Sequence, residues 1–234
     1  MINKDLLKNE AAKIGVELDD TALDRFDVYA KLLVEKNRVM NLTGITEPDE
    51  IVIKHFIDSL ELMRFAKLNS GARVADIGTG AGFPGVPLLI ANNDIELTLV
   101  DSLKKRLDFL REVLSECELD AEIIHSRAED AGQNAVLRET FDIVTARAVA
   151  PLNVLAEYCL PFVKVGGSFL ALKGTSEDIT QSEDALSVLG GSIENIYEYE
   201  LPGGYKRIIV YVKKISQTPT QYPRKSKKIA TKPL

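Results

Sequence analysis

The sequence predicts an α/β protein in which a mostly parallel sheet follows an N-terminal group of helices. From residue 73 onward, short apolar runs alternate with amphipathic stretches at βαβ spacing. Before residue 70, apolar residues recur at helical spacing. Between the two regions, a short apolar run reaches Asp76 and is followed by the glycine-rich segment 78–85, a pattern typical of a buried strand turning into a helix.

The first 70 residues are expected to form a helical cap. We expect three helices, with apolar stripes within residues 6–14, 23–33 and 52–63. The capping-box spacing of Thr21 and Asp24 predicts the start of the second helix, and Pro48 predicts the start of the third. The third stripe includes His55 and Ser59, so both are expected to face the body of the protein.

Seven strands are expected after the cap. We predict strands at residues 73–77, 96–100, 121–125, 141–146, 167–172, 192–199 and 206–213, and helices near residues 84–92, 103–117, 151–160 and 176–189. Short links imply right-handed crossovers between parallel strands. The turn Pro202-Gly203-Gly204 makes the last two strands an antiparallel hairpin. The expected domains are a helical cap (1–70), a catalytic α/β domain (71–215) and a basic flexible tail (216–234).

Composition limits the class of protein. The chain has 234 residues, 45% of them hydrophobic, which supports a substantial core. It has no run of 18 apolar residues and no signal-peptide pattern, so we expect a cytoplasmic protein without a membrane span. Cys117 and Cys159 have no metal-ligand spacing and there are two histidines, so we expect reduced thiols and no metal site. No heptad pattern is present, and we expect a monomer.

Charge is distributed unevenly along the chain. The net charge is −6, but residues 206–234 contain nine Lys and Arg and no acidic residue. This basic segment is either a phosphate-binding arm or a solubilising tail. Charge alone leaves both interpretations open.

The glycine-rich segment indicates a nucleotide-cofactor site. Gly80 to Gly85 fits the dinucleotide pattern G-x-G-x-x-G, but a carboxylate at Asp76 would repel a pyrophosphate. S-adenosylmethionine carries an ammonium and a sulfonium, which a carboxylate attracts. Asp101 ends the next strand, about 20 residues after the loop, where a carboxylate can accept the ribose hydroxyls. An isolated aspartate at either position could equally be a turn or helix cap, but the two together with the glycines favour a cofactor site.

An ordered set of motifs resembles the bacterial 16S ribosomal RNA guanine-N7 methyltransferases, also called glucose-inhibited division protein B. The match runs from about Asn37 to the end. Its motifs are Asn41-Leu42-Thr43, His55-Phe56-Ile57-Asp58-Ser59, Asp76 through Leu88, Leu99-Val100-Asp101-Ser102, Lys105-Arg106, Ser126-Arg127-Ala128-Glu129, Arg147-Ala148, Leu172-Lys173-Gly174 and Tyr222-Pro223-Arg224-Lys225. One departure is Lys36, where many relatives have tryptophan; it puts a stacking role there in doubt.

The resemblance implies a Rossmann-like class I methyltransferase with a seven-stranded sheet. It implies that S-adenosylmethionine methylates N7 of guanine 527, in the 530 loop of 16S ribosomal RNA in the small ribosomal subunit. N7 has a free lone pair, so we expect direct in-line displacement without a general base. Residues and resemblance together predict a cofactor site of Asp76, Gly78, Gly80, Gly82, Phe83, Asp101, Ser102, Ala128, Glu129 and Arg147.

Other residues are candidates for orienting or binding RNA. Arg147 and His55 could orient the target base, although His55 could equally be a satisfied core residue, and Asp58 is expected to be structural. The predicted RNA contacts are Arg127, Lys173, Arg224 and Lys225. Three alternatives stay open: a methyltransferase acting on transfer RNA, protein or a small molecule, a nicotinamide oxidoreductase, and a non-catalytic ribosome-binding module.

Overall fold

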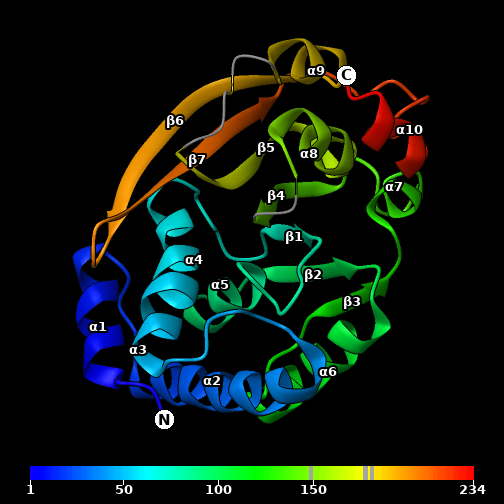
Figure 1. Cartoon of the computed structure of the whole chain (residues 1–234). Helices are drawn as coiled ribbons and strands as arrows, with labels where there is room; N and C mark the ends of the chain where they lie inside the picture. Colours follow the sequence, from blue (N-terminus) through cyan, green and yellow to red (C-terminus); the bar gives the residue numbers. More distant parts are fainter. Residues whose placement is uncertain (148–149, 176–178, 180–181) are drawn as a thin grey trace.

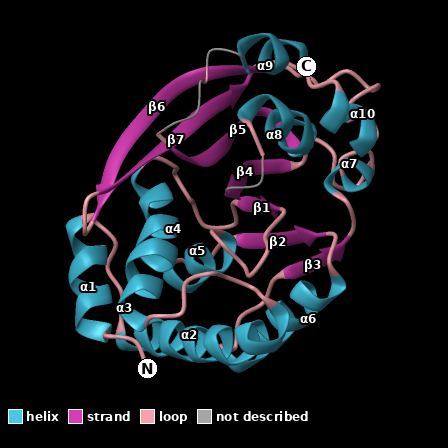
Figure 2. Ribbon diagram, viewed as in Figure 1, coloured by secondary structure: helices cyan, strands magenta, loops and turns pink. Residues whose placement is uncertain are grey.

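A seven-stranded sheet forms the centre of the molecule (Figures 1 and 2). The computed structural model describes residues 1–147, 150–175, 179 and 182–234. The strand order is β3-β2-β1-β4-β5-β7-β6. The strands are β1 Arg73–Ile77, β2 Glu96–Asp101, β3 Glu122–His125, β4 Phe141–Arg147, β5 Val163–Gly174, β6 Gly191–Leu201 and β7 Tyr205–Lys214. Strands β1 to β5 are parallel, and β7 is antiparallel to both of its neighbours. The predicted fold class and the antiparallel hairpin are confirmed.

Alternating side chains divide the core into two clusters. Val74 and Leu99 belong to a cluster formed with the cap helices, α5 and α6, whereas Ala75 and Val100 belong to a cluster formed with α8 and α9. Neighbouring residues of a strand point to opposite faces, so the two clusters lie on the two sides of the sheet. The cap shares its core with one face of the sheet and has no separate core among the described residues.

The helices follow the predicted order with several differences in their ends. They are α1 Lys4–Lys13, α2 Asp20–Met40, α3 Pro48–Ile51, α4 Asp58–Leu60, α5 Gly85–Ala91, α6 Lys104–Glu116, α7 Ala128–Ala131, α8 Leu152–Cys159, α9 Glu183–Val188 and α10 Ser226–Thr231. Asp19 caps α2 by accepting from the Ala22 amide at 2.7 Å, so the predicted capping box at Thr21 and Asp24 is wrong. Helix α9 is shorter than residues 176–189. Residues 176–178, 180–181 and Ala148 lie outside the described residues.

The predicted third cap helix is not a continuous α-helix. A π-helical stretch, Val52–Ile57, separates α3 from α4, and a 3-10 turn, Glu61–Arg64, follows α4. This segment buries His55, Asp58 and Ser59 against the body of the protein, as the stripe predicted. π-Helical turns are rare and often occur at functional sites.

The C-terminal segment differs from the expectation of a flexible tail. Thr218, Tyr222 and Ile229 are buried, and α10 contacts α8. Arg138 donates to four carbonyls, two of them from Thr218 and Tyr222 at 2.7 and 2.8 Å. Residues 216–234 therefore form an ordered segment, which we call the strap, that packs against α8 and against the residues around α7. None of the helices in the described residues is long and apolar enough to span a membrane.

We predict that Gly82→Ala destabilises the protein by about 2–5 kcal/mol, measured by urea unfolding. Gly82 has φ +101°, and an added Cβ would lie 2.7 Å from the Tyr29 hydroxyl and 2.8 Å from Leu110. Gly204→Ala is the control, because Gly204 also has positive φ (+83°) but open space around it. Equal losses for the two variants would show that close packing at Gly82 contributes nothing.

Candidate functional site

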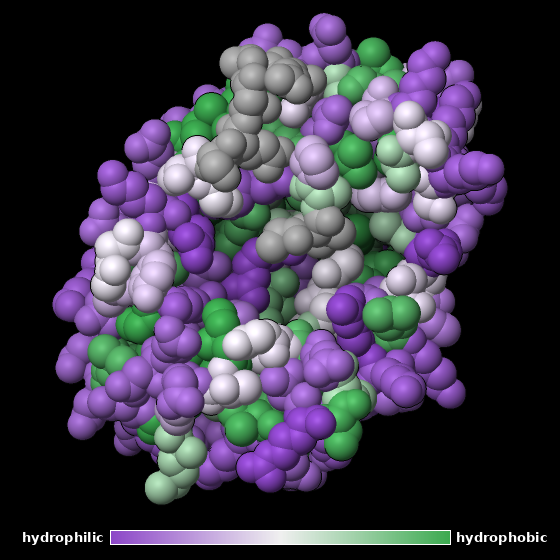
Figure 3. All heavy atoms as spheres, in the orientation of Figure 1, coloured by the Kyte–Doolittle hydropathy of each residue, from purple (hydrophilic) through white to green (hydrophobic). Residues whose placement is uncertain are grey.

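A cavity of about 500 Å³ lies at the carboxyl ends of β1, β2 and β4. The chain order reverses between β1 and β4, and ligands of open α/β sheets bind in the crevice at such a reversal. The space-filling view shows the centre of this face hollowed (Figure 3). The size is within the range of small-molecule sites. We call this space the first cavity.

The loop after β1 forms the floor of the first cavity. Gly78 and Gly80 have φ +68° and +61°, which glycine adopts without a steric penalty. The amides of Gly78 and Thr79 donate to the Val100 carbonyl at 2.9 and 3.1 Å, so the loop folds against β2. Both glycines line the cavity, and so does Phe83; all three are among the residues predicted to hold the cofactor.

Asp101, at the end of β2, is held by the loop beside it. Its Oδ2 accepts from the Gly80 amide at 2.9 Å, and its Oδ1 accepts from the Leu103 amide at 2.8 Å. Arg106 Nη1 also donates to Oδ2, over a long 3.5 Å. A carboxylate oxygen has two lone pairs, so Oδ1 keeps one for a ligand in the cavity, and Oδ2 can accept a ligand in place of the long Arg106 contact. Asp101 and Ser102 both line the first cavity.

Asp76 and Gly82 do not line the first cavity, contrary to the sequence expectation. Asp76 is fully buried, and its Oδ2 accepts from the Thr79 hydroxyl at 2.7 Å and from the Gly85 amide at 2.9 Å. It joins the loop to the start of α5. Burial raises its pKa to about 6, although the bonds from Thr79 and Gly85 oppose the rise. Gly82 packs against Tyr29, whose hydroxyl donates to the Ala81 carbonyl.

The opposite wall comes from α7 and α8. Ala128 and the buried Glu129, two of the predicted cofactor residues, line it beside Leu155 and Tyr158 of α8. The strap supports this wall from behind. Arg224 binds the buried carboxylate of Glu157 through its backbone amide, Nε and a terminal nitrogen, at 2.8, 2.8 and 2.5 Å.

Arg147, at the end of β4, joins the sheet to the cap. Its guanidinium donates to the Lys54 carbonyl at 3.2 Å, to Asp58 Oδ2 at 3.1 Å and to His55 Nδ1 at 3.0 Å. It also lies 4.7 Å from the centre of the Phe83 ring, on which His55 stacks at 4.4 Å. The Tyr199 hydroxyl donates to the other oxygen of Asp58 at 2.8 Å, which fits the structural role expected of Asp58.

His55 is fixed in its neutral form by this arrangement. Burial, and then the positive charge of Arg147, lower its pKa to about 3. Because Arg147 donates to Nδ1, the ring hydrogen must be on Nε2, which donates to the Thr43 hydroxyl oxygen at 2.8 Å. Both ring nitrogens are therefore engaged by protein groups.

A second cavity, of about 610 Å³, adjoins the first and shares His55 and Arg147 with it. Lys173 lines the second cavity, is buried, and donates from Nζ to the Ala150 carbonyl. This side chain, predicted to contact RNA, is therefore held inside the protein at the end of β5.

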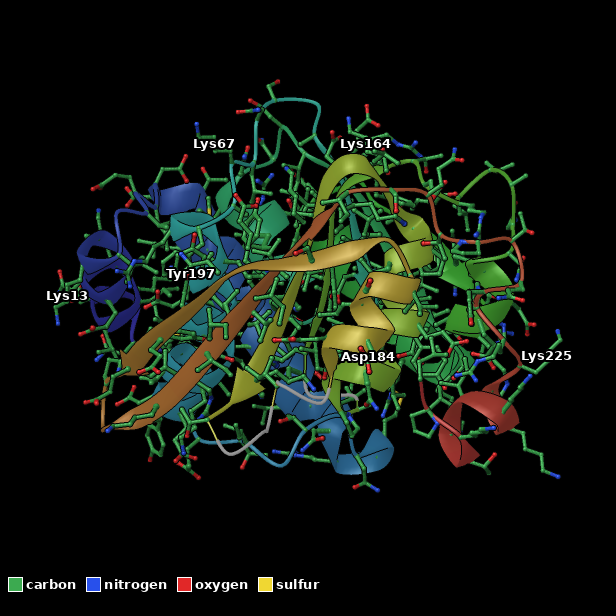
Figure 4. All side chains as sticks on the ribbon, turned by 90° about the horizontal axis from the view of Figure 1, so that it is seen from above. Lys13, Lys67, Lys164, Asp184, Tyr197 and Lys225 are labelled. Carbon is green, nitrogen blue, oxygen red and sulfur yellow. The ribbon has the colours of Figure 1, made fainter. Side chains whose placement is uncertain are left out.

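The other predicted RNA contacts are not brought together. Arg127 is exposed at the rim of the first cavity. Arg224 is bound to Glu157, and Lys225 points outward beside α10 while pairing with Asp130 at 3.0 Å (Figure 4). The geometry thus gives Arg224 a structural partner, which charge counting along the sequence could not reveal.

Several lining residues were not predicted as site residues, among them the polar side chains of Thr43, Arg106 and Tyr158. Thr43 and Arg106 stand within the motifs that carry the resemblance, which was the available signal. Tyr158 has no comparable signal, because its helical spacing resembles that of ordinary core-facing residues. Among the described residues, no group of three or more His, Cys, Asp or Glu side chains could hold a metal ion.

Comparison with known proteins gives a family match. The family "GidB: rRNA small subunit methyltransferase G" matches residues 22–202. Proteins named "Ribosomal RNA small subunit methyltransferase G" match over nearly the full length. The protein from Acetivibrio thermocellus is 49% identical, covering 98% of this chain and 96% of its own. The one from Alkaliphilus metalliredigens is 45% identical, with complete coverage of both chains.

Solved structures with low identity share the fold. The M. jannaschii TYW2 structure in complex with AdoMet has a TM-score of 0.51 at 14% identity, covering 63% of this chain and 71% of that one. The YcgJ protein from Bacillus subtilis has a TM-score of 0.53 at 14% identity, covering 69% of this chain and 100% of that one. These similarities concern the fold alone.

We predict that acidification erodes the contribution of His55 to stability. The folded pKa is about 3 and the unfolded value is 6.5, so the unfolded chain binds the extra proton between these values and stability falls as pH drops below 6.5. The stability difference between the wild type and His55→Gln should shrink by about 2 kcal/mol between pH 7.5 and 5 in urea unfolding. Taking the difference between two proteins cancels the opposing titration of Asp76. A difference that stays constant with pH would contradict a neutral, buried His55.

We predict that Arg224→Ala destabilises the protein by about 3–5 kcal/mol in urea unfolding, because it leaves the Glu157 carboxylate buried without its cation. Lys225→Ala is the matched control: its pair with Asp130 is exposed, and the loss should be below about 1 kcal/mol. Similar small losses for both variants would mean that the strap is weakly held.

Proposed function

The chain belongs to the rRNA small subunit methyltransferase G family and is an S-adenosylmethionine-dependent methyltransferase of small-subunit ribosomal RNA; we propose that its acceptor atom is N7 of a guanine in the 530 loop of 16S ribosomal RNA. The observation that supports the site of this chemistry best is Asp101, fixed by the Gly80 and Leu103 amides at the edge of the first cavity. We further propose that the protein acts as a cytoplasmic monomer on the small subunit.

The residues around the first cavity fit S-adenosylmethionine. Asp101 offers a carboxylate held in place for a ribose diol, and the positive-φ glycines let backbone approach a ligand without side chains between them. Ala128 and Glu129 would face the adenine of the cofactor, as the resemblance implies. When bound, S-adenosylmethionine supplies a methyl group activated by a sulfonium.

The geometry supports transfer without a general base. Guanine N7 has a lone pair and loses no proton when it is methylated. His55 is the neutral imidazole in the first cavity, yet Arg147 occupies its Nδ1 and Thr43 accepts from its Nε2. It is thus poorly placed to remove a proton. What the described residues can contribute is orientation, which is worth about 7–11 kcal/mol in favourable intramolecular cases.

Transfer RNA, protein and small molecules remain competing acceptors. The test offers methyl-labelled S-adenosylmethionine to small subunits, free 16S RNA, large subunits, transfer RNA and total protein, and then maps the labelled nucleoside. We expect label in one 7-methylguanosine of 16S RNA. Label confined to transfer RNA or protein, or at a different guanine atom, would refute the proposal.

We predict that Asp101→Ala weakens binding of S-adenosylhomocysteine by about 10- to 100-fold in calorimetry, because the carboxylate that would accept from the ribose hydroxyls is lost. Asp108→Ala is the control, since Asp108 is a half-exposed carboxylate on α6 that pairs with Arg111. The Asp101 variant is expected to keep its fold by circular dichroism. Wild-type affinity in Asp101→Ala would remove this residue from the cofactor site.

A further inference from the structure

The second cavity has a different chemical character from the first. It lies beyond the wall formed by His55 and Arg147, at the carboxyl end of β5 and the start of β7. Its lining includes four cationic side chains and one carboxylate among the described residues: Lys54, Arg147, Lys173, Arg207 and Asp58. This excess of cations favours an anionic ligand.

The one carboxylate is already neutralised within the protein. Asp58 is buried, binds Arg147 and accepts from Tyr199, so it does not compete for a ligand's cationic groups. Three of the five N–H donors of Arg147 are in turn bound to protein acceptors, which fixes its guanidinium and leaves fewer donors for an incoming base. This matters because a donor on guanine N7 would block the atom that is methylated.

Two of the cations keep capacity for an anion. Arg207 is about a third exposed (32%), its Nε is 3.9 Å from Asp58, and one terminal nitrogen donates to the Lys206 carbonyl. A guanidinium has five N–H donors, so most remain for a ligand. Lys54 pairs with Glu50 at 2.6 Å and lies over the Tyr205 ring, and its ammonium has three donors.

The rest of the lining suits a nucleobase. Pro151 and Leu172 supply apolar surface against which a flat ring can pack, and the volume is in the range of small-molecule sites. His55 and Arg147 line both cavities, so the two cavities adjoin along these side chains. A base in the second cavity would therefore lie next to a methyl donor in the first.

We propose that the second cavity receives the target nucleotide of the RNA, and that Arg207 and Lys54 bind a phosphodiester oxygen beside the target base. This inference rests on the proposed function, because it takes an RNA nucleotide as the acceptor. Phosphate contacts fix register and add affinity that falls with salt.

The test uses the full-length protein and free 16S RNA in the presence of S-adenosylhomocysteine. Arg207→Gln should weaken RNA binding about tenfold at low salt and reduce the slope of log affinity against log salt by about 0.7. Affinity for S-adenosylhomocysteine should stay within twofold of the wild type. Arg207→Lys, which retains the cation, should keep most of the salt slope.

Lys213→Gln is the matched control. Lys213 is on the same strand, at the opposite end of the sheet, and removing it deletes the same charge. Its RNA affinity and salt slope should be close to those of the wild type.

Each outcome bears on one claim. Wild-type RNA affinity and slope in Arg207→Gln would overturn the second cavity as the nucleotide site, and so would equal effects of Arg207→Gln and Lys213→Gln. A parallel loss of S-adenosylhomocysteine affinity would also overturn it, because Arg207 would then act through the first cavity. Failure of the wild type to form 7-methylguanosine in 16S RNA would instead refute the proposed function.

Discussion

The site depends on the buried interaction of Arg147 with Asp58 and His55. Arg147 ends β4, whereas its acceptors belong to the cap segment 52–60, about 90 residues earlier in the sequence. A charged pair so little exposed is stable only when its hydrogen bonds are satisfied, and here three acceptors and an aromatic face surround the guanidinium. The interaction fixes the cap against the sheet and forms the wall between the two cavities.

Elements on both faces of the sheet hold the other sides of the two cavities in place. On one face, Tyr29 of α2 packs on the glycine loop, so the cap controls the floor of the first cavity. On the other face, the strap binds α8 through Glu157 and holds the opposite wall. The hairpin β6–β7 brings Tyr199 to Asp58 and Arg207 to the second cavity. Segments from both ends of the chain thus position one small region.

Local sequence patterns predicted the strands and the fold class, because these depend mainly on residues close together in the sequence. Apolar runs and turn residues located all seven strands. The central strands β1, β2 and β4 are buried on both faces, which leaves few alternatives for their composition. The partly exposed β6 was located together with β7 by the turn between them. The side chain of Asp76 was misplaced for a related reason: strand side chains alternate between faces, and Asp76 faces α5 while the backbone after it faces the cavity. The sequence did not predict that the strap is ordered. Its packing depends on Glu157 and Arg224, a pair 67 residues apart that no periodicity indicates. The sequence could not decide the role of His55 for the same reason, since its partner Arg147 is 92 residues away.

The most direct test of the role of Arg147 is to measure single-turnover methyl transfer by Arg147→Lys, together with the cofactor and RNA affinities of the same protein. Lysine keeps the charge beside Asp58 but cannot bond three acceptors in a fixed plane. We expect both affinities within about threefold of the wild type and a transfer rate lower by about 100-fold, the loss typical of a small misplacement of reacting groups. An unchanged rate, or a rate loss fully explained by weaker binding, would show that Arg147 does not align the two cavities.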